Sequence, residues 1–194
     1  VEAVRKYWKE ILQATGAFFV VNATFYILIS GVLDYATKTV GMSRTSILLC
    51  VMGAGLTQVI TMPFFGALTD RMGSRKKLYL AGTVGMAIWA FPLFWLIDTG
   101  SVLATLVACV VAGAGFAVAS GPYGAYLAEA FPTAVRYSGS SVAYALGSVV
   151  GGALAPIVAT VLFAATGTGT AISAYVVVLG LISLVATLAL RSPH

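Results

Sequence analysis

The sequence predicts an all-α membrane protein in which six transmembrane helices form one bundle. Hydrophobic residues make up 60% of the 194 residues and charged residues 9%, whereas soluble domains carry about 25% charged residues. Six apolar stretches are long enough to cross a bilayer core, which takes about 20 residues per helix. They occupy residues 14–33, 45–68, 78–97, 102–128, 142–163 and 171–190.

The segment before the first span, residues 1–13, has a different pattern. Charged residues are interspersed with apolar residues that recur at three- and four-residue steps, among them Val4, Trp8 and Ile11. This spacing predicts an amphipathic linker helix on the cytoplasmic membrane surface, followed by a bundle over residues 14–194. The first residue is Val1 rather than methionine, so we expect the chain to be part of a longer protein.

Glycine and proline inside the spans predict where helices pack closely and where they bend. Four spans contain a proline: Pro63, Pro92, Pro122 and Pro156. Proline removes a backbone hydrogen bond, and Gly121 beside Pro122 makes the fourth span the strongest candidate for a bend. A GxxxG unit at 147–151 predicts close helix packing. The last span, 171–190, is nearly all aliphatic and is expected to face lipid.

The basic residues divide unequally between the two sides of the predicted bundle. With the amino end on the cytoplasmic side, nine Lys and Arg residues fall in inner segments and only Lys38 and Arg44 in outer loops. This asymmetry follows the positive-inside rule, so both termini are expected to be cytoplasmic and the net charge of +5 does not indicate nucleic-acid binding. Cys50 and Cys109 fall within spans and His194 is terminal, so we expect no metal site and no cofactor.

The turn between the second and third spans carries an ordered set of residues, GALTDRMG at 66–73. Gly66 allows two helices to approach closely, and Gly73 allows a tight reversal. The Asp70 carboxylate is suited to the N-terminus of a neighbouring helix. Basic residues of the turn can pair with carboxylates or lipid phosphates: Arg71, Arg75, Lys76 and Lys77. The turn is expected to be either a latch that closes one side of the protein or a basic loop that only fixes orientation.

Three blocks of the sequence carry a resemblance to a known family. GALTDRMG at 66–73 resembles the signature cytoplasmic loop of the major facilitator superfamily. AEAFPTAVRYSG at 128–139 and the outer loop 35–44 are similar to the metabolite:proton symporter family within it. The resemblance covers nearly all of this chain but about half of a typical member. Ser74 replaces the usual second basic residue after Gly73, which weakens the latch unless Arg75 and Lys76 take over.

The resemblance implies a fold and a function. The chain corresponds to the carboxyl-terminal half, a 3+3 inverted repeat, of a twelve-helix transporter. Such proteins carry small polar or anionic metabolites across the bacterial inner membrane by alternating access, with proton-coupled symport as the expected mechanism. The implied partners are the lipid bilayer, an N-terminal six-helix half, a metabolite and protons. The alternative is a self-associating six-helix scaffold or half-carrier; no residue cluster indicates an enzyme.

Polar residues at membrane depth are costly and therefore mark candidates for function. Asn22, Tyr26 and Ser30 follow one another at four-residue steps and form one stripe on the first span. The other carboxamide within a span is Gln58. Either group lines a solute path or bonds one helix to another. Tyr123 and Tyr126 can bind a solute or fill the core. Together these residues are the candidate solute path: Asn22, Tyr26, Ser30, Gln58, Tyr123 and Tyr126.

Titratable residues are confined to the ends of the predicted spans. Asp34 at the outer mouth is a candidate proton sensor. Glu129 and Arg136 flank the turn between the fourth and fifth spans and are expected to pair with each other. If transport is coupled to protons, we expect the principal proton carrier to lie in the other half of the protein.

Overall fold

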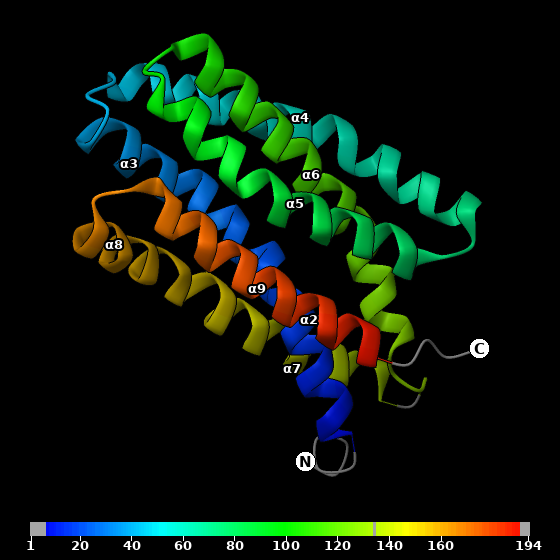
Figure 1. Cartoon of the computed structure of the whole chain (residues 1–194). Helices are drawn as coiled ribbons and strands as arrows, with labels where there is room; N and C mark the ends of the chain where they lie inside the picture. Colours follow the sequence, from blue (N-terminus) through cyan, green and yellow to red (C-terminus); the bar gives the residue numbers. More distant parts are fainter. Residues whose placement is uncertain (1–6, 134, 191–194) are drawn as a thin grey trace.

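The computed structural model describes residues 7–133 and 135–190, and these residues form helices joined by short turns (Figure 1). Six helices are long and apolar enough to cross a membrane. They span Trp8–Lys38, Arg44–Met72, Arg75–Asp98, Val102–Glu129, Arg136–Thr166 and Gly169–Ala189. The structure thus confirms the prediction of an all-α protein with six membrane-length helices.

Four of these helices are regular, and two contain a wider, π-helical segment. The first is α2 (Trp8–Tyr26), η1 (Ile27–Gly31) and α3 (Val32–Lys38). The second, third and fourth are α4 (Arg44–Met72), α5 (Arg75–Asp98) and α6 (Val102–Glu129). The fifth is α7 (Arg136–Gly147), η2 (Ser148–Ala153) and α8 (Leu154–Thr166), and the sixth is α9 (Gly169–Ala189).

The helices pack in a definite order across the bundle (Figure 1). α6 packs against α4 and α5, while α9 packs against α5 and α2. α2 in turn packs against α7 and η2. The start of α2, the end of α9 and the α4–α5 and α6–α7 turns lie at one end of the bundle. We call this the terminal end and the opposite one the far end.

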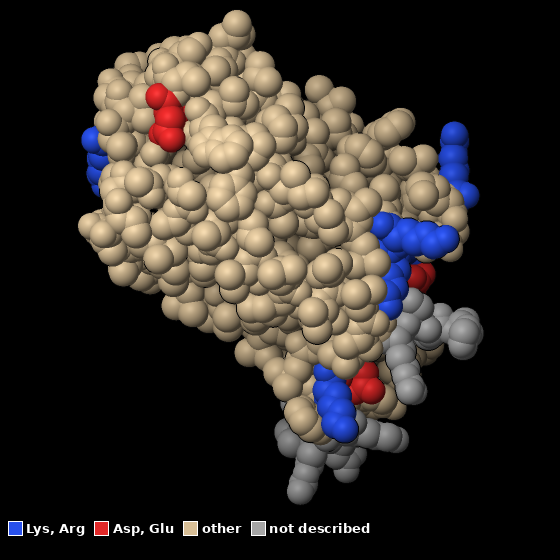
Figure 2. All heavy atoms as spheres, in the orientation of Figure 1, with Lys and Arg blue, Asp and Glu red and all other residues tan. Residues whose placement is uncertain are grey.

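Charged side chains gather at the two ends of the molecule. Figure 2 shows a broad uncharged band between them on the face that it displays. A band of this kind is what a helical bundle presents to hydrocarbon, because an unpaired charge there is costly.

The first helix begins earlier than the predicted span. It starts at Trp8 and continues without interruption past residue 14. Residues 8–13 of the predicted linker are therefore the beginning of the first long helix and not a separate element, and Tyr7 is its N-cap residue. The amphipathic pattern and the apolar run share the helical period, and no glycine or proline separates them. Residues 1–6 of the predicted linker lie outside the described residues.

Small residues bring neighbouring helices close together, as close packing in lipid requires. A Cβ atom added to Gly113 of α6 would lie 2.7 Å from the Ala54 carbonyl oxygen of α4. One added to Gly82 of α5 would lie 2.6 Å from the Ala119 nitrogen of α6. Gly151 of the GxxxG unit faces α2, where an added Cβ would lie 3.0 Å from the backbone.

The two π-helical segments are features that the sequence analysis does not predict. η2 contains Gly152 and lies just before Pro156, which has no N–H to bond the Gly152 carbonyl. A wider turn there accommodates the proline ring. η1 contains no proline and ends at Gly31. The other span prolines lie inside continuous α-helices: Pro63, Pro92 and Pro122.

One face of α9 is buried, so the expectation that the last span faces lipid is wrong for that face. Ser183 Oγ donates to the Gly16 carbonyl oxygen at 2.9 Å and accepts from the Val20 N–H at 3.0 Å. The hydroxyl therefore lies between two groups of α2 that ordinarily bond to each other. Ser173 Oγ donates to the Ala90 carbonyl oxygen of α5 at 2.8 Å. The two serines anchor α9 to its neighbours.

Candidate functional site

At the terminal end, Arg75 joins three helices through two ion pairs. It is the first residue of α5, and its Nη2 donates to Asp70 Oδ1 of α4 at 2.9 Å. Its Nη1 pairs with Oε1 of Glu129, the last residue of α6. The side chain of Arg75 is 31% exposed, against 65% for Asp70 and 47% for Glu129. Solvent therefore weakens each pair, but the planar guanidinium is suited to binding two carboxylates at once.

Two glycines shape the α4–α5 turn beside this network. Gly73 ends α4 in the left-handed region, with a φ of 64°, and its N–H donates to the Thr69 carbonyl at 3.2 Å. Glycine adopts this conformation without strain. Gly66 lies where α4 crosses α6, since a Cβ added to Gly121 would lie 3.1 Å from the Gly66 nitrogen. Gly121 thus serves a helix crossing, and α6 continues as a helix through it.

The other basic residues of the turn have different surroundings. Lys76 Nζ donates to the carbonyl oxygens of Leu188 at 3.3 Å and Leu190 at 2.8 Å. It caps the carboxyl end of α9, where unpaired carbonyls favour a cation. Arg71 is exposed and forms no ion pair with the described residues. The structure therefore brings Asp70, Arg75 and Glu129 together and leaves Arg71 outside the network.

The predicted pair between Glu129 and Arg136 is not formed, and that expectation is wrong. Glu129 pairs with Arg75, while Arg136 Nε donates to the Phe131 carbonyl oxygen at 3.5 Å. The reason is the position of Phe131, which is 1% exposed and packs closely against Gly139. Its burial fixes the α6–α7 turn and keeps the guanidinium of Arg136 on the turn's own backbone.

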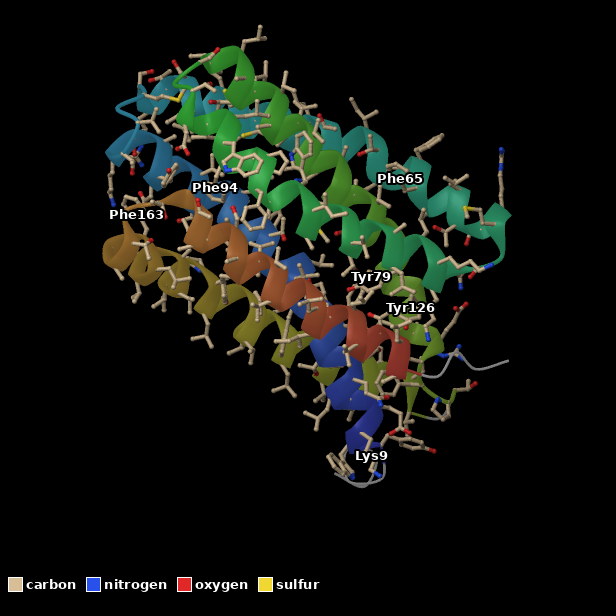
Figure 3. All side chains as sticks on the ribbon, viewed as in Figure 1. Lys9, Phe65, Tyr79, Phe94, Tyr126 and Phe163 are labelled. Atoms are coloured by element: carbon tan, nitrogen blue, oxygen red, sulfur yellow. The ribbon has the colours of Figure 1, made fainter. Side chains whose placement is uncertain are left out.

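At the far end, a buried tyrosine joins three helices, and the sequence analysis missed its acidic partner. Tyr35 Oη of α3 donates to Asp98 Oδ1 at 2.6 Å and accepts from the Gly169 N–H at 3.1 Å. The rings of Phe94 and Phe163, labelled in Figure 3, meet Tyr35 edge-on at centroid distances of 5.2 and 5.4 Å. The sequence feature that indicates this interaction is Asp98 itself, an acidic residue directly after an apolar span.

Asp34 lies one residue from this tyrosine but points elsewhere. Its Oδ2 lies 3.3 Å from Lys38 Nζ, one helical turn further on, and the two side chains are 52% and 64% exposed. An exposed pair of this spacing contributes little stability. Asp34 is thus open to solvent at the far end.

Aromatic rings form a row across the core toward the terminal end. Tyr123 of α6 stacks on Phe18 of α2, with centroids 4.5 Å apart. Tyr79 of α5 lies 5.6 Å from Tyr123 and 5.5 Å from Tyr126, and Figure 3 shows Tyr79 and Tyr126 near each other. Tyr79 Oη donates to a carbonyl of α2, and Tyr126 Oη to a carbonyl of α9 at 3.4 Å.

Two hydroxyls on α6 lack a hydrogen-bond partner among the described residues. Tyr123 Oη and Ser120 Oγ are both buried, and they lie three residues apart, on one side of the helix. Buried polar groups are almost always paired with protein or water. These two hydroxyls of α6 therefore keep hydrogen-bonding capacity that the described residues do not use.

The three residues of the polar stripe on the first helix have different surroundings: one bonds to a neighbouring helix and two are exposed. Asn22 Nδ2 donates to the carbonyl oxygens of Gly147 at 3.4 Å and Ser148 at 3.2 Å, so it bonds the first helix to the fifth. Tyr26 is 42% exposed and Ser30 is exposed as well. Gln58 on α4 is half-buried, and its side chain forms no hydrogen bond with the other described residues. Asn22 follows Phe18 by one helical turn, and Phe18 is the residue that stacks on Tyr123.

Six membrane-length helices with charges at their ends define a multi-pass membrane protein. The chain belongs to the Major Facilitator Superfamily, whose family model matches residues 14–194. The resemblance of the 66–73 loop to this superfamily is thereby confirmed.

Known relatives of the chain are named as transporters. The shikimate transporter of Escherichia coli (strain K12) is 30% identical over 160 residues, which cover 78% of this chain and 36% of that protein. The proline/betaine transporter of the same strain is 29% identical over 154 residues, covering 78% and 30%. The citrate-proton symporter of Salmonella typhi is 27% identical over 165 residues, covering 84% and 38%. The chain thus spans about a third of the length of these relatives.

Proposed function

We propose that this chain forms the carboxyl-terminal six-helix half of a secondary transporter for a small polar or anionic metabolite. The observation that carries the proposal is membership of a superfamily whose relatives here are named as carriers of shikimate, proline or betaine, and citrate. The proposed location is the bacterial inner membrane, with both termini cytoplasmic, so that the terminal end faces the cytoplasm. The excess of basic residues at that end supports this orientation.

Unequal burial of the helices supports a partner half. Of an apolar 18-residue stretch in the first helix, 61% is buried within the bundle, whereas the corresponding shares are 17% in α4 and 22% in the fifth helix. α4 carries half-buried Gln58 and the fifth helix carries exposed Tyr144. Polar groups on sparsely covered helices favour contact with protein or a water-filled path over contact with lipid alone.

The proposed solute path runs along the side of the bundle that bears these polar groups. It comprises Gln58 of α4, the unpaired hydroxyls of Ser120 and Tyr123, and the exposed Tyr26 and Ser30. Asn22 is placed beside the path, where it holds the first and fifth helices together. Tyr126 stacks on Tyr79, which in turn contacts Tyr123. Hydroxyls and a phenol are suited to a polar solute, because they can replace the hydrogen bonds that the solute makes with water.

The gating role is assigned to the charged turn at the terminal end. Asp70 and Glu129 are held by Arg75 within this half. Arg71 and Arg136 are exposed, and we assign them to contacts with the other half. Alternating access then requires the solute to have different affinities for the two conformations. Proton coupling is supported by the relative that is named as a citrate-proton symporter. Within this chain, Asp34 is the candidate proton-binding residue. We assign the principal proton-carrying residue to the other half of the protein.

Uptake by the reconstituted carrier tests the proposal. The reading frame that contains this chain is expressed whole, reconstituted into proteoliposomes and supplied with labelled shikimate, proline, glycine betaine or citrate, with and without an inward proton gradient. The proposal predicts saturable uptake of at least one solute, increased by the gradient. A stable self-associated assembly that moves none of them under either condition supports the scaffold alternative.

A further inference from the structure

A cavity in the middle of the bundle shares no residue with the proposed solute path. It has a volume of about 240 Å³ and lies between α5 and α6, with Thr24 and Ile27 of the first helix and Val176 of α9 at its base. Its α5 residues run from Gly85 to Phe94, and its α6 residues from Val111 to Val118. Phe94, labelled in Figure 3, marks the side nearer the far end. These residues lie near the middle of their helices, so the cavity lies at mid-membrane depth.

The walls of the cavity are apolar except for one unpaired hydroxyl. Trp89 borders it, but its Nε1 already donates to the Ala108 carbonyl oxygen at 3.1 Å. Thr24 is 8% exposed, and its Oγ1 has no hydrogen-bond partner among the described residues. A buried water needs two to four polar partners, which one hydroxyl does not supply. The cavity is therefore suited to an apolar molecule and not to water.

The cavity opens on the outer surface between α5 and α6. Gly85 and Val111 border it, and both are exposed. A Cβ atom added to Gly85 would have no neighbouring atom within 4 Å, so nothing covers the mouth on the α5 side. The next exposed residue along this face is Ile88, 66% exposed. In a membrane-spanning bundle a mouth bordered by such side chains faces hydrocarbon.

We infer that this cavity binds a small uncharged lipophile that enters from the bilayer and carries one hydrogen-bonding group for Thr24. An apolar cavity of about 150 Å³ holds benzene, so by proportion 240 Å³ accommodates a molecule of about ten carbons. A medium-chain alcohol has this size and chemistry. Its chain fills the apolar walls, and its hydroxyl satisfies Thr24 Oγ1 at the base. A lipid headgroup is excluded because no charged side chain borders the cavity.

The test uses the fluorescence of Trp89 as a probe inside the wall. The chain has three tryptophans, and the other two, Trp8 and Trp95, are 52% and 61% exposed, so both are replaced by phenylalanine. The protein in lipid nanodiscs is titrated with 8-bromo-1-octanol and with 1-bromooctane, whose bromine quenches tryptophan. We expect saturable quenching by both probes. The alcohol should bind about two- to tenfold more tightly, as one hydrogen bond allows.

Three variants separate the cavity from general partitioning into lipid. Thr24→Val should remove the preference for the alcohol and leave bromooctane binding intact. Gly85→Leu should close the mouth and abolish saturation with both probes, and Val111→Phe should do so from the α6 side without adding a second tryptophan, with helicity checked by circular dichroism. Gly55→Leu on α4 is the matched control, because its added side chain also enters open space; it should change nothing. Linear quenching that Gly85→Leu does not alter would overturn the site, and an alcohol preference that survives Thr24→Val would overturn the role assigned to its hydroxyl.

Discussion

Replacing Arg75 tests whether one guanidinium holds the terminal ends of α4, α5 and α6 together. Arg75→Gln leaves Asp70 and Glu129 without their cation. Exposed ion pairs contribute about 0.2 to 1 kcal/mol each, so the two pairs predict a loss of about 0.4 to 2 kcal/mol in the free energy of unfolding. The coupling with Glu129 should be the larger one, because Glu129 is less exposed than Asp70.

Double-mutant cycles measure these couplings separately. Arg75→Gln is combined with Glu129→Gln and with Asp70→Asn, and unfolding in mixed detergent micelles is followed by tryptophan fluorescence. The Asp34–Lys38 pair at the far end is the matched control, since both of its side chains are more than half exposed. Its coupling should be about 0.3 to 0.5 kcal/mol, as for helical pairs at this spacing. All three couplings should weaken with added salt.

Two results would refute this reasoning. The first is a coupling between Arg75 and Glu129 no larger than that of the far-end control. The second is a measurable coupling between Glu129 and Arg136, which would restore the pairing that the sequence suggests and the structure replaces.

Three further changes have definite expected outcomes. Tyr35→Phe removes the hydrogen bond to Asp98 and should lower the free energy of unfolding, measured in the same micelles, by about 1 to 3 kcal/mol. An unchanged stability would show that Tyr35 does not hold the far ends of the helices together. Gly113→Leu places a side chain where a Cβ already lies 2.7 Å from the Ala54 carbonyl, so α4 should separate from α6 and thermal stability should fall sharply, whereas a stable variant would show that the helices are not so close. Tyr123→Phe removes an unpaired hydroxyl, so stability should hold while the half-saturating solute concentration rises in uptake assays; an unchanged value would remove Tyr123 from the path.

The sequence predicts the number of helices and their order because apolar length is a direct consequence of membrane thickness. It also identifies the 66–73 turn as a candidate functional segment, because glycine and charged residues occur there in a fixed order. The pairing within the turn was not predictable, since Arg75, Lys76 and Lys77 are alike in sequence. Only the packed helices show that Arg75 reaches two carboxylates while Lys76 caps α9.

The prediction for α9 failed for a related reason. Ser173 and Ser183 are isolated polar residues in a mostly aliphatic segment, so the sequence pattern of α9 indicates lipid exposure on all sides. In the structure both serines form inter-helix hydrogen bonds. Asp98 was overlooked because it stands alone at the end of a span, and its partner Tyr35 is far away in sequence. Contacts of this kind depend on which helices become neighbours, and span lengths carry no such information.

Thiol accessibility along α4 tests the central claim, that its sparsely covered side lines a water-filled path between two halves. In the whole carrier, with Cys50 and Cys109 replaced by alanine, single cysteines are introduced by Gln58→Cys and by Val178→Cys, the latter on the exposed face of α9. The account predicts that a membrane-impermeant thiol reagent labels the cysteine at 58, that saturating solute protects it, and that the cysteine at 178 is not labelled. Equal absence of labelling at both positions would place α4 against lipid or tightly packed protein and contradict the account.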